Sequence, residues 1–352
     1  MIYTLCIISV LILSYVADKR EQRFPVFLCV LILSLFCGLR GVGTGVDTYN
    51  YYHFMLYIRE SGIYFGSDIG FSIISYFLMG FLDNPYYPLV FFSFITNFLI
   101  VYRLWEFRKE ASFSLMLLIY MALQYAYVFN IVRQFLAISI IFWGTKYIER
   151  GEYIKYTILN IIASTIHTSS LLCFSMLFVR FGYKTKKKKY RILGFGAAAI
   201  FVVVGIYAFS TNVAKYIEYF TTPSTSSIYW MVLLKVICVA IVLFANKVLS
   251  NDEFSISKNG EAVPMQRQIS TLYSLGLMLS LMGMFFPFMN RIGFYFIIFE
   301  MPFWGQAIRA KTNRYIYFLF IVFIVGYKLI TMYLSGTISD NLFVYHSFLN
   351  DM

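Results

Sequence analysis

Apolar runs follow one another along almost the whole chain, from residue 2 to residue 334, with only short polar stretches between them. A helix needs roughly 20 mostly apolar residues to cross the hydrocarbon core of a bilayer, and many of these runs reach or approach that length. Hydrophobic residues make up 60% of the chain and charged residues only 13%, which excludes a soluble core inside a solvated shell. We therefore predict an all-α, polytopic integral membrane protein in which residues 1–352 form a single transmembrane domain.

The basic residues indicate how the predicted spans are oriented. Most of the 29 Lys and Arg residues fall in six clusters between apolar runs, and the strongest cluster contains four lysines at 186–189. Lys and Arg accumulate in cytoplasmic loops, so we assign these clusters to the inside. The net charge of +12 then reflects topology and not nucleic-acid binding. This assignment puts both termini outside, with outer loops near 40–68 and 210–228 and inner loops near 183–191 and 250–267.

Tracing the chain through these loops gives about 12 transmembrane helices, including short or re-entrant hairpin elements. Residues 69–82 and 86–105 look like two apolar helices, but the alternation of loops allows them one net crossing, so we expect one to be re-entrant or a half-span. The arms of a hairpin at 153–167 and 169–182 span roughly 21 Å each at helical rise, short of the roughly 30 Å core. Such helices are tolerated where they line a cavity. Full spans are expected near 2–17, 24–39, 112–128, 131–148, 192–209, 229–249, 268–288, 292–308 and 315–334.

Four groups of polar residues fall on the predicted outer side. Ionisable groups at membrane depth are costly and usually mark a pathway or a site. Arginine suits phosphate, because its planar fork donates parallel hydrogen bonds and stays charged. The alternatives are that the arginines anchor span ends to headgroups and that the tyrosines form an interfacial aromatic belt. We favour a site built from Arg40, Asp47, Tyr49 and Tyr52; Asn130, Arg133 and Gln134; the segment His167-Thr168-Ser169-Ser170; and Asn290 with Arg291.

The sequence indicates no metal site and no nucleotide site. Its three histidines are scattered, with no cysteine or carboxylate at the spacing of a metal ligand. The glycines at 41, 43 and 45 lack the preceding strand and the lysine of a phosphate-binding loop. We therefore expect the protein to work without a metal or other cofactor.

An ordered set of motifs resembles the EpsG family of bacterial polysaccharide polymerases, which is similar in role to the Wzy O-antigen and capsule polymerases. The resemblance spans nearly the whole chain. A further motif, His167-Thr168-Ser169-Ser170-Leu171, is similar to the His-x-x-x-Leu motif of O-antigen ligases, although threonine stands where Asn, Ser or Gln is usual. The EpsG-like motifs are Gly38-Leu39-Arg40, Gly43-Thr44-Gly45-Val46-Asp47-Thr48-Tyr49, Asn130-Ile131-Val132-Arg133-Gln134-Phe135-Leu136-Ala137, Ala163-Ser164-Thr165-Ile166-His167-Thr168-Ser169, and Asn290-Arg291 with Pro302 downstream.

The resemblance implies a fold similar to that of membrane lipid-linked glycosyltransferases. It also implies polymerisation of oligosaccharide repeat units carried on undecaprenyl pyrophosphate, at the periplasmic face of a bacterial inner membrane. The implied partners are these glycan substrates, membrane lipids and a chain-length regulator.

In this reaction Arg133 and Arg291 hold the pyrophosphate and stabilise the charge that develops on it. Arg40 positions a second carrier or Asp47. His167 and Asp47 compete for the role of general base, and we favour His167. The other predicted substrate-binding residues are Tyr49, Tyr52, Asn130, Gln134 and Asn290.

Two other functions remain open. A membrane glycosyltransferase that uses a lipid-phosphate sugar donor would also have an aspartate in an outer loop, which Asp47 satisfies. A repeat-unit flippase would share the many spans, but it should carry cationic residues through the whole pore, whereas this chain concentrates them at one end.

Overall fold

The described part of the chain is helical. A computed structural model describes residues 2–66, 68–184, 188–211, 265–283, 287–309 and 345–350, with isolated positions at 240 and within 315–326. Over these residues it contains α-helices, short 3-10 helices, one π-helical turn and no β-strand. The all-α prediction is confirmed for them. Most of the predicted outer loop at 210–228, of the span at 229–249, of the inner loop at 250–267 and of the span at 315–334 lies outside the described residues.

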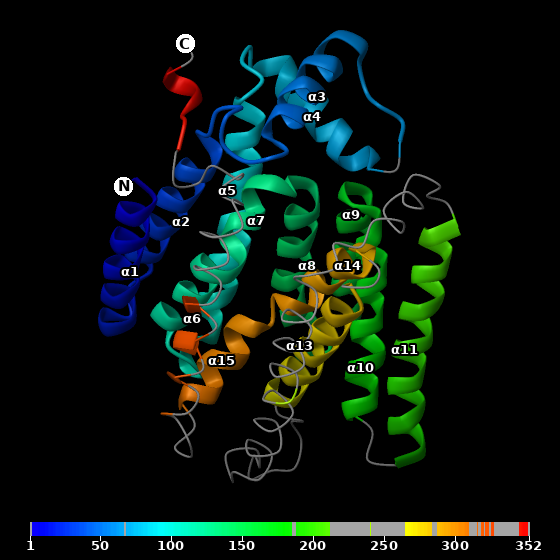
Figure 1. Ribbon diagram of the computed structural model, residues 1–352. Helices are drawn as coiled ribbons and strands as arrows, with labels where there is room; N and C mark the ends of the chain where they lie inside the picture. The colour runs from blue at the N-terminus through cyan, green and yellow to red at the C-terminus, as the bar shows by residue number, and fades with distance from the viewer. Residues whose placement is uncertain are drawn as a thin grey trace, which may run out of the picture. The chain divides into compact units, whose positions relative to one another are not determined.

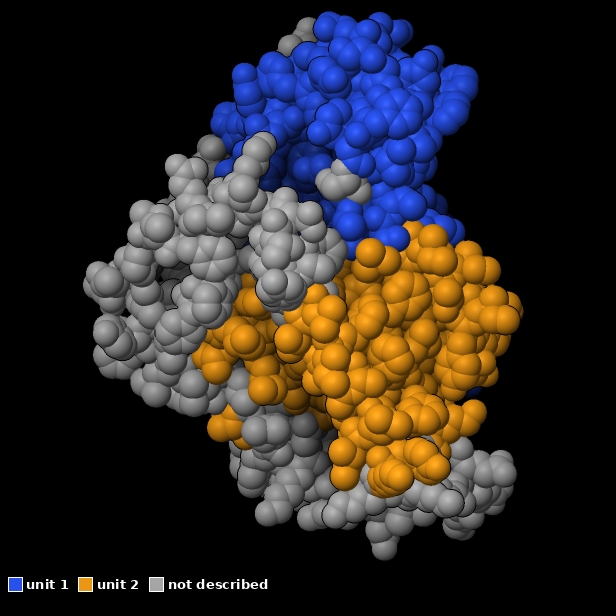
Figure 2. Space-filling view, turned by 90° about the vertical axis from the view of Figure 1, so that its right-hand side faces the viewer, with its two compact units in different colours: residues 1–143, 162–168, 304–352 blue, residues 144–161, 169–303 orange. Residues whose placement is uncertain are grey.

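The chain divides into two compact units, coloured separately in Figure 2. Unit 1 contains Met1–Trp143, Ile162–Thr168 and Trp304–Met352. Unit 2 contains Gly144–Ile161 and Ser169–Phe303. That residues 1–352 form one transmembrane domain stays a prediction.

Unit 1 holds most of the N-terminal helices, and two of them, α3 and α4, lie together at one end of it (Figure 1). In the N-terminal part of the chain it contains α1 (Ile2–Arg20), α2 (Arg23–Gly38), α3 (Thr48–Ser61), α4 (Ile69–Phe81), α5 (Tyr87–Glu106), α6 (Phe113–Ile119), α7 (Tyr125–Asn130) and the first part of α8 (Val132–Arg150). The predicted outer loop at 40–68 therefore contains a helix, α3, that the apolar pattern did not indicate.

Two helical stretches in the described residues, Tyr87–Lys109 and Phe113–Asn130, are long and apolar enough to cross a membrane. α4 is also apolar but has only 13 residues, about 20 Å at helical rise, which is too short for the hydrocarbon core. Of the two helices expected between residues 69 and 105, α4 is thus the one that cannot span by itself.

Asp18, near the end of α1, caps the first turn of α6. Its carboxylate accepts hydrogen bonds from the amides of Phe113 at 3.2 Å and Ser114 at 2.9 Å, and from the hydroxyls of Ser112 and Ser114, each at 2.9 Å. The first amides of a helix have no partner within the helix, and a carboxylate there also interacts favourably with the helix dipole. This contact joins α1 to α6 within unit 1.

The stretch from α6 to α7 is interrupted by a π-helical turn, Tyr120–Gln124. Two hydrogen bonds connect this turn to other helices. Tyr3 of α1 donates its hydroxyl to the Met121 carbonyl at 3.1 Å, and Tyr120 of the turn donates to Oδ1 of Asn97 on α5 at 2.9 Å. α7 then ends at Asn130, and Ile131 leaves helical geometry with φ −95° and ψ 57°. Because α8 begins directly afterwards, Arg133 lies in its first turn.

Unit 2 contains the lower-numbered part of α9 (Tyr153–Ile166), most of the 3-10 helix η3 (Thr168–Phe174), α10 (Ser175–Lys184), α11 (Lys188–Thr211), α13 (Met265–Met282) and α14 (Pro287–Ile297). α9 ends at Ile166 and η3 begins at Thr168, so the helix breaks at His167, where the turn of a hairpin was predicted. Tyr156 donates its hydroxyl to the Cys173 carbonyl at 2.8 Å, which fastens α9 to η3.

The prediction of one continuous span over 292–308 is wrong. α14 ends at Ile297, a turn follows, and α15 (Glu300–Arg309) begins at Glu300. Pro302 lies in the first turn of α15, where its missing N–H costs nothing. Proline is well suited to this position and poorly suited to the middle of a span, so the break has a local cause.

We expect Asp18→Ala to lower the unfolding temperature of the purified protein in detergent by a few degrees, because hydrogen bonds to a charged acceptor contribute about 1.5–3 kcal/mol. Glu21→Ala is the matched control, since Glu21 is an exposed carboxylate three residues further on. Equal shifts in the two variants would contradict a capping role for Asp18.

Candidate active site

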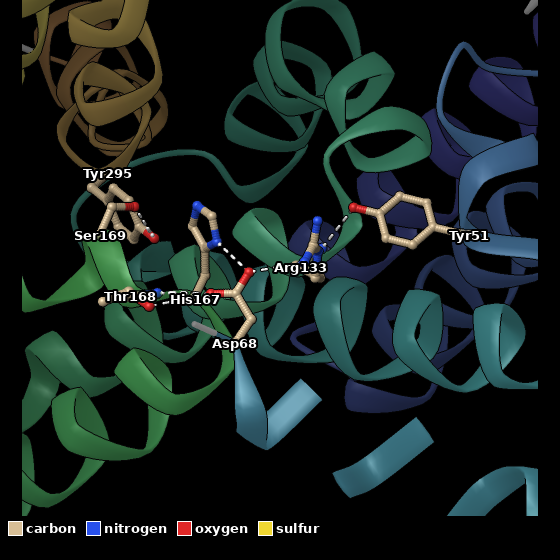
Figure 3. A network of polar contacts seen from close by, with 7 residues as sticks. All are labelled: Tyr51, Asp68, Arg133, His167, Thr168, Ser169 and Tyr295. Atoms are coloured by element: carbon tan, nitrogen blue, oxygen red, sulfur yellow. Dashed lines mark hydrogen bonds and ion pairs between the residues drawn. The ribbon is translucent and has the colours of Figure 1, made fainter. Parts of the chain in front are cut away.

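The carboxylate of Asp68 joins three segments that are far apart in the sequence (Figure 3). Its Oδ2 accepts from Arg133 Nη1 at 3.0 Å and lies 3.3 Å from His167 Nδ1. Its Oδ1 accepts from the amide of Thr168 at 3.2 Å and from its hydroxyl at 3.3 Å. All four residues belong to unit 1, and we refer to them together as the Asp68 cluster. The Asp68 side chain is only 10% exposed.

Local sequence explains why Asp68 reaches these partners. Asp68 is the N-cap of α4, but it makes no side-chain hydrogen bond to its own helix, although Asp usually does so at this position. Two residues later, a Cβ atom at Gly70 would lie 2.2 Å from Thr165 Oγ1 and 2.9 Å from the Thr165 carbonyl carbon. Glycine therefore allows the start of α4 to approach the end of α9, where His167 follows.

Arg133 presents a positively charged surface at the start of α8. Its guanidinium uses one N–H on Asp68, lies 5.9 Å from the ring centroids of both Tyr51 and Phe71, and is 42% exposed as a side chain. Its backbone amide donates to the Tyr51 hydroxyl at 3.4 Å. A guanidinium at a helix N-terminus, with further donors on its fork, favours an anion such as phosphate.

The charge of Asp68 determines which nitrogen of His167 carries a proton. Burial alone would raise the pKa of the Asp68 carboxyl, but the hydrogen bond from His167 and the charges of His167 and Arg133 outweigh burial and hold that pKa below its ordinary value. An ionised carboxylate can only accept hydrogen bonds, so Nδ1 of His167 must carry the proton. In the neutral imidazole, Nε2 then keeps a free lone pair and can accept a proton from a substrate hydroxyl.

Arg40 lies in the core of unit 1. It is 0% exposed, donates to Thr48 Oγ1 at 2.9 Å and to the Cys37 carbonyl at 2.5 Å, and lies 5.5 Å from the Phe129 ring centroid. These contacts hold the loop between α2 and α3. Its predicted contact with a second carrier or with Asp47 stays a prediction.

The same loop is fixed from α7 by Asn130, whose Oδ1 accepts from the Val46 amide at 2.8 Å. Gly45 makes room for this contact, because it has φ +84° and a Cβ there would lie 2.9 Å from that oxygen. Asp47 follows as the N-cap of α3, half-buried, with its Oδ1 3.4 Å from Asn50 Nδ2. Asn130 therefore holds the backbone that presents Asp47.

The other predicted residues of unit 1 are distributed around α3 and α8. Tyr49 is exposed and its ring packs against His53, with centroids 4.2 Å apart. Tyr52 is half-buried and packs against Tyr86 at 4.9 Å. Gln134 is buried, one residue after Arg133. Their predicted contacts with substrate are not tested by these positions.

Asn290 and Arg291 lie on α14 in unit 2. Asn290 accepts from Ser280 Oγ at 2.9 Å, which fastens α14 to α13, and Arg291 is exposed. Ser169 of the predicted polar segment donates to the Tyr295 hydroxyl at 3.2 Å, also within unit 2 (Figure 3). That Arg133 and Arg291 bind the same pyrophosphate stays a prediction.

Asp68 is the member of the candidate site that the sequence analysis did not select. It stood at the last position of a predicted loop, and the only local signal was an aspartate directly before an apolar helix with glycine two residues later.

The described residues contain no group of three or more His, Cys, Asp or Glu side chains placed to hold a metal ion. That the protein needs no cofactor stays a prediction.

We expect Asp68→Asn to lower the unfolding temperature at neutral pH and to lose this effect in acid. Because the folded-state pKa of Asp68 is lowered, its stabilisation is complete above the unfolded-state pKa of about 4 and disappears as the pH falls through the folded-state value. The measurement is thermal unfolding of both proteins between neutral and acid pH. Asp83→Asn, at an exposed aspartate that pairs with Arg59 at 3.4 Å, is the control. If the difference in unfolding temperature between wild type and Asp68→Asn stayed constant into the acid range, the ionised Asp68 would not be the source of the stabilisation.

Of three comparisons with known proteins, one finds a match. No curated protein and no solved structure matches the chain. A family comparison matches the EpsG family over residues 23–347, which include every helix from α2 to α15 and all four residues of the Asp68 cluster. Because the match covers nearly the whole chain, the protein belongs to the EpsG family.

Proposed function

We propose that this protein polymerises oligosaccharide repeat units carried on undecaprenyl pyrophosphate, for O-antigen, capsule or exopolysaccharide synthesis. The observation that carries the proposal is the Asp68 cluster, in which an ionised aspartate orients a histidine beside an arginine at a helix N-terminus. Membership of the EpsG family supports the class of reaction.

The proposed reaction transfers a growing glycan chain from its lipid carrier to the next repeat unit. A hydroxyl of the incoming unit attacks the anomeric carbon of the growing chain, and the bond from that carbon to the pyrophosphate oxygen breaks. His167 Nε2 takes the hydroxyl proton, and undecaprenyl pyrophosphate leaves as an anion. The partly exposed Arg133 side chain stabilises the negative charge that develops on the leaving oxygen. Asp68 is a positioning residue: it orients His167 and stabilises the imidazolium that forms.

The setting we propose is the bacterial inner membrane, with about 12 transmembrane helices and the Asp68 cluster facing the periplasm. The distribution of basic residues supports this orientation. Membrane lipids surround the spans, and a chain-length regulator is the protein partner that the family resemblance implies. Arg291 is the second arginine that we propose for the pyrophosphate.

For the orientation, we expect Asn50→Cys to react with a membrane-impermeant thiol reagent in intact cells and Glu21→Cys to react only after permeabilisation. Both positions are exposed in unit 1, whereas Cys6, Cys29, Cys37 and Cys173 are buried. The reverse pattern would contradict the proposed orientation.

For catalysis, we expect His167→Gln to reduce polymer formation roughly 10²- to 10⁴-fold, because glutamine can preserve a hydrogen bond to Asp68 but cannot take up the proton. The measurement is the rate of polymer formation by purified protein from lipid-linked repeat units. His346→Gln is the control, since the hydrogen bonds recorded for His346 run through its backbone. Polymerisation by the His167 variant at the wild-type rate would remove His167 from the mechanism and leave Asp47 as the candidate base.

The role of Arg133 in binding the pyrophosphate can be tested by substitution. We expect Arg133→Ala and Arg133→Lys each to form polymer at only a small fraction of the wild-type rate, because the ammonium group of lysine cannot reproduce the several donors of a guanidinium. Arg59→Lys, at an exposed arginine on α3, should leave the rate unchanged. Full activity of Arg133→Lys would contradict a bidentate role for Arg133, because any positive charge at this position would then suffice.

A further inference from the structure

Four exposed ring side chains form a row along α3 and the loop that follows it. Tyr49, His53 and Tyr57 are spaced four residues apart, which places them on one face of the helix. Tyr64 continues the row, with its ring centroid 6.5 Å from that of Tyr57. The three tyrosines are 57%, 48% and 52% exposed, in chain order. We call these four residues the aromatic row.

The backbone and neighbours of the row hold its rings in place. The opposite face of α3 is anchored in unit 1 by Met55 and Ile58, which are fully buried. The Tyr64 amide donates to Ser72 Oγ at 2.7 Å. A Cβ at Gly66 would lie 2.0 Å from the Tyr64 ring, so glycine is what lets this ring fold back over the loop. Exposed rings that are already ordered lose little entropy when a ligand binds.

The chemistry of the row fits a sugar chain. Tyrosine and histidine rings offer an apolar face with a polar edge, and a pyranose offers an apolar C–H face with a rim of hydroxyls. The four rings carry no carboxylate, lysine or arginine, and the exposed Glu60 lies beside them on the same face of α3. The helical spacing of the row, about 6 Å between successive positions, is comparable to the length of one sugar residue. A surface for lipid tails would instead be built from aliphatic side chains.

The row shares α3 with a neighbour of the Asp68 cluster, although the two lie on different faces of the helix. The same helix carries Tyr51, whose hydroxyl accepts from the Arg133 amide, and it begins at Asp47, whose carboxylate can accept hydrogen bonds from sugar hydroxyls. Tyr52 links the row to α5, because its ring contacts both His53 at 5.5 Å and Tyr86 at 4.9 Å.

We propose that the aromatic row is an extended glycan-binding subsite, which holds the sugar chain of a lipid-linked substrate by ring stacking while its reacting end lies at the Asp68 cluster. The proposal rests on the proposed polymerase function and extends the substrate contacts of Tyr49 and Tyr52 to His53, Tyr57 and Tyr64. The competing occupant is the membrane interface, against which tyrosines also accumulate.

The test is equilibrium binding of oligosaccharides of one to four repeat units, prepared from the surface polysaccharide of the producing strain, to the full chain in lipid nanodiscs. We expect Tyr57→Ala and Tyr64→Ala each to weaken binding of the longest oligosaccharide about three- to tenfold, and the double variant to abolish the gain in affinity with chain length. Tyr57→Phe should bind like the wild type, since the ring remains. Tyr76→Ala, at an exposed tyrosine on α4, is the matched control.

Unchanged oligosaccharide affinity in the double variant would contradict the proposed subsite. The aromatic row would then be interpreted as part of the aromatic belt at the membrane interface. Equal weakening by Tyr76→Ala would also contradict the subsite, because the effect would then not belong to the row. Oligosaccharide binding is measured without polymerisation, so the subsite proposal and the polymerase proposal are tested independently. Failure of the polymerase proposal appears as a wild-type protein that forms no polymer, whereas failure of the subsite appears as unchanged oligosaccharide affinity.

Discussion

One buried carboxylate connects the parts of this protein on which the proposed chemistry depends. Asp68 takes hydrogen bonds from residues 65, 99 and 100 positions away in the sequence. A buried charge is costly unless it is paired and hydrogen-bonded, and here both oxygens are occupied. The start of α4, the start of α8 and the end of α9 are thereby held together within unit 1.

The sharing of Asp68 between Arg133 and His167 has a consequence for substrate binding. Both side chains contact the same oxygen, Oδ2. A pyrophosphate that draws Arg133 towards itself would compete with Asp68 for the guanidinium. Loss of that contact would leave the carboxylate charge more fully available to His167, where an imidazolium forms during the proposed reaction.

The helical class followed from the length of the apolar runs, and the break after Ile166 followed from the polar segment that interrupts them. Arg133 and His167 stood out because they are ionisable residues in a chain with few charges. Asp68 did not, because its importance comes from contacts with Arg133, His167 and Thr168 and from the close approach that Gly70 permits. Asp47, set among glycines and tyrosines, looked more like a site residue, yet its recorded side-chain contact is with Asn50 on its own helix. The split of 292–308 into α14 and α15 falls just before Glu300 and Pro302, which both suit the first turn of a helix.

The tautomer of His167 tests the account most directly, because the chain has only three histidines and their ring nitrogens can be resolved by solid-state nitrogen NMR of histidine-labelled protein. At a pH where the ring is neutral, the account predicts that His167 carries its proton on Nδ1 and leaves Nε2 unprotonated. It also predicts that Asp68→Asn removes this preference while Asp83→Asn keeps it. A His167 ring protonated on Nε2 in the wild type, or one indifferent to the Asp68 substitution, would contradict the claim that Asp68 prepares this histidine to act as a base.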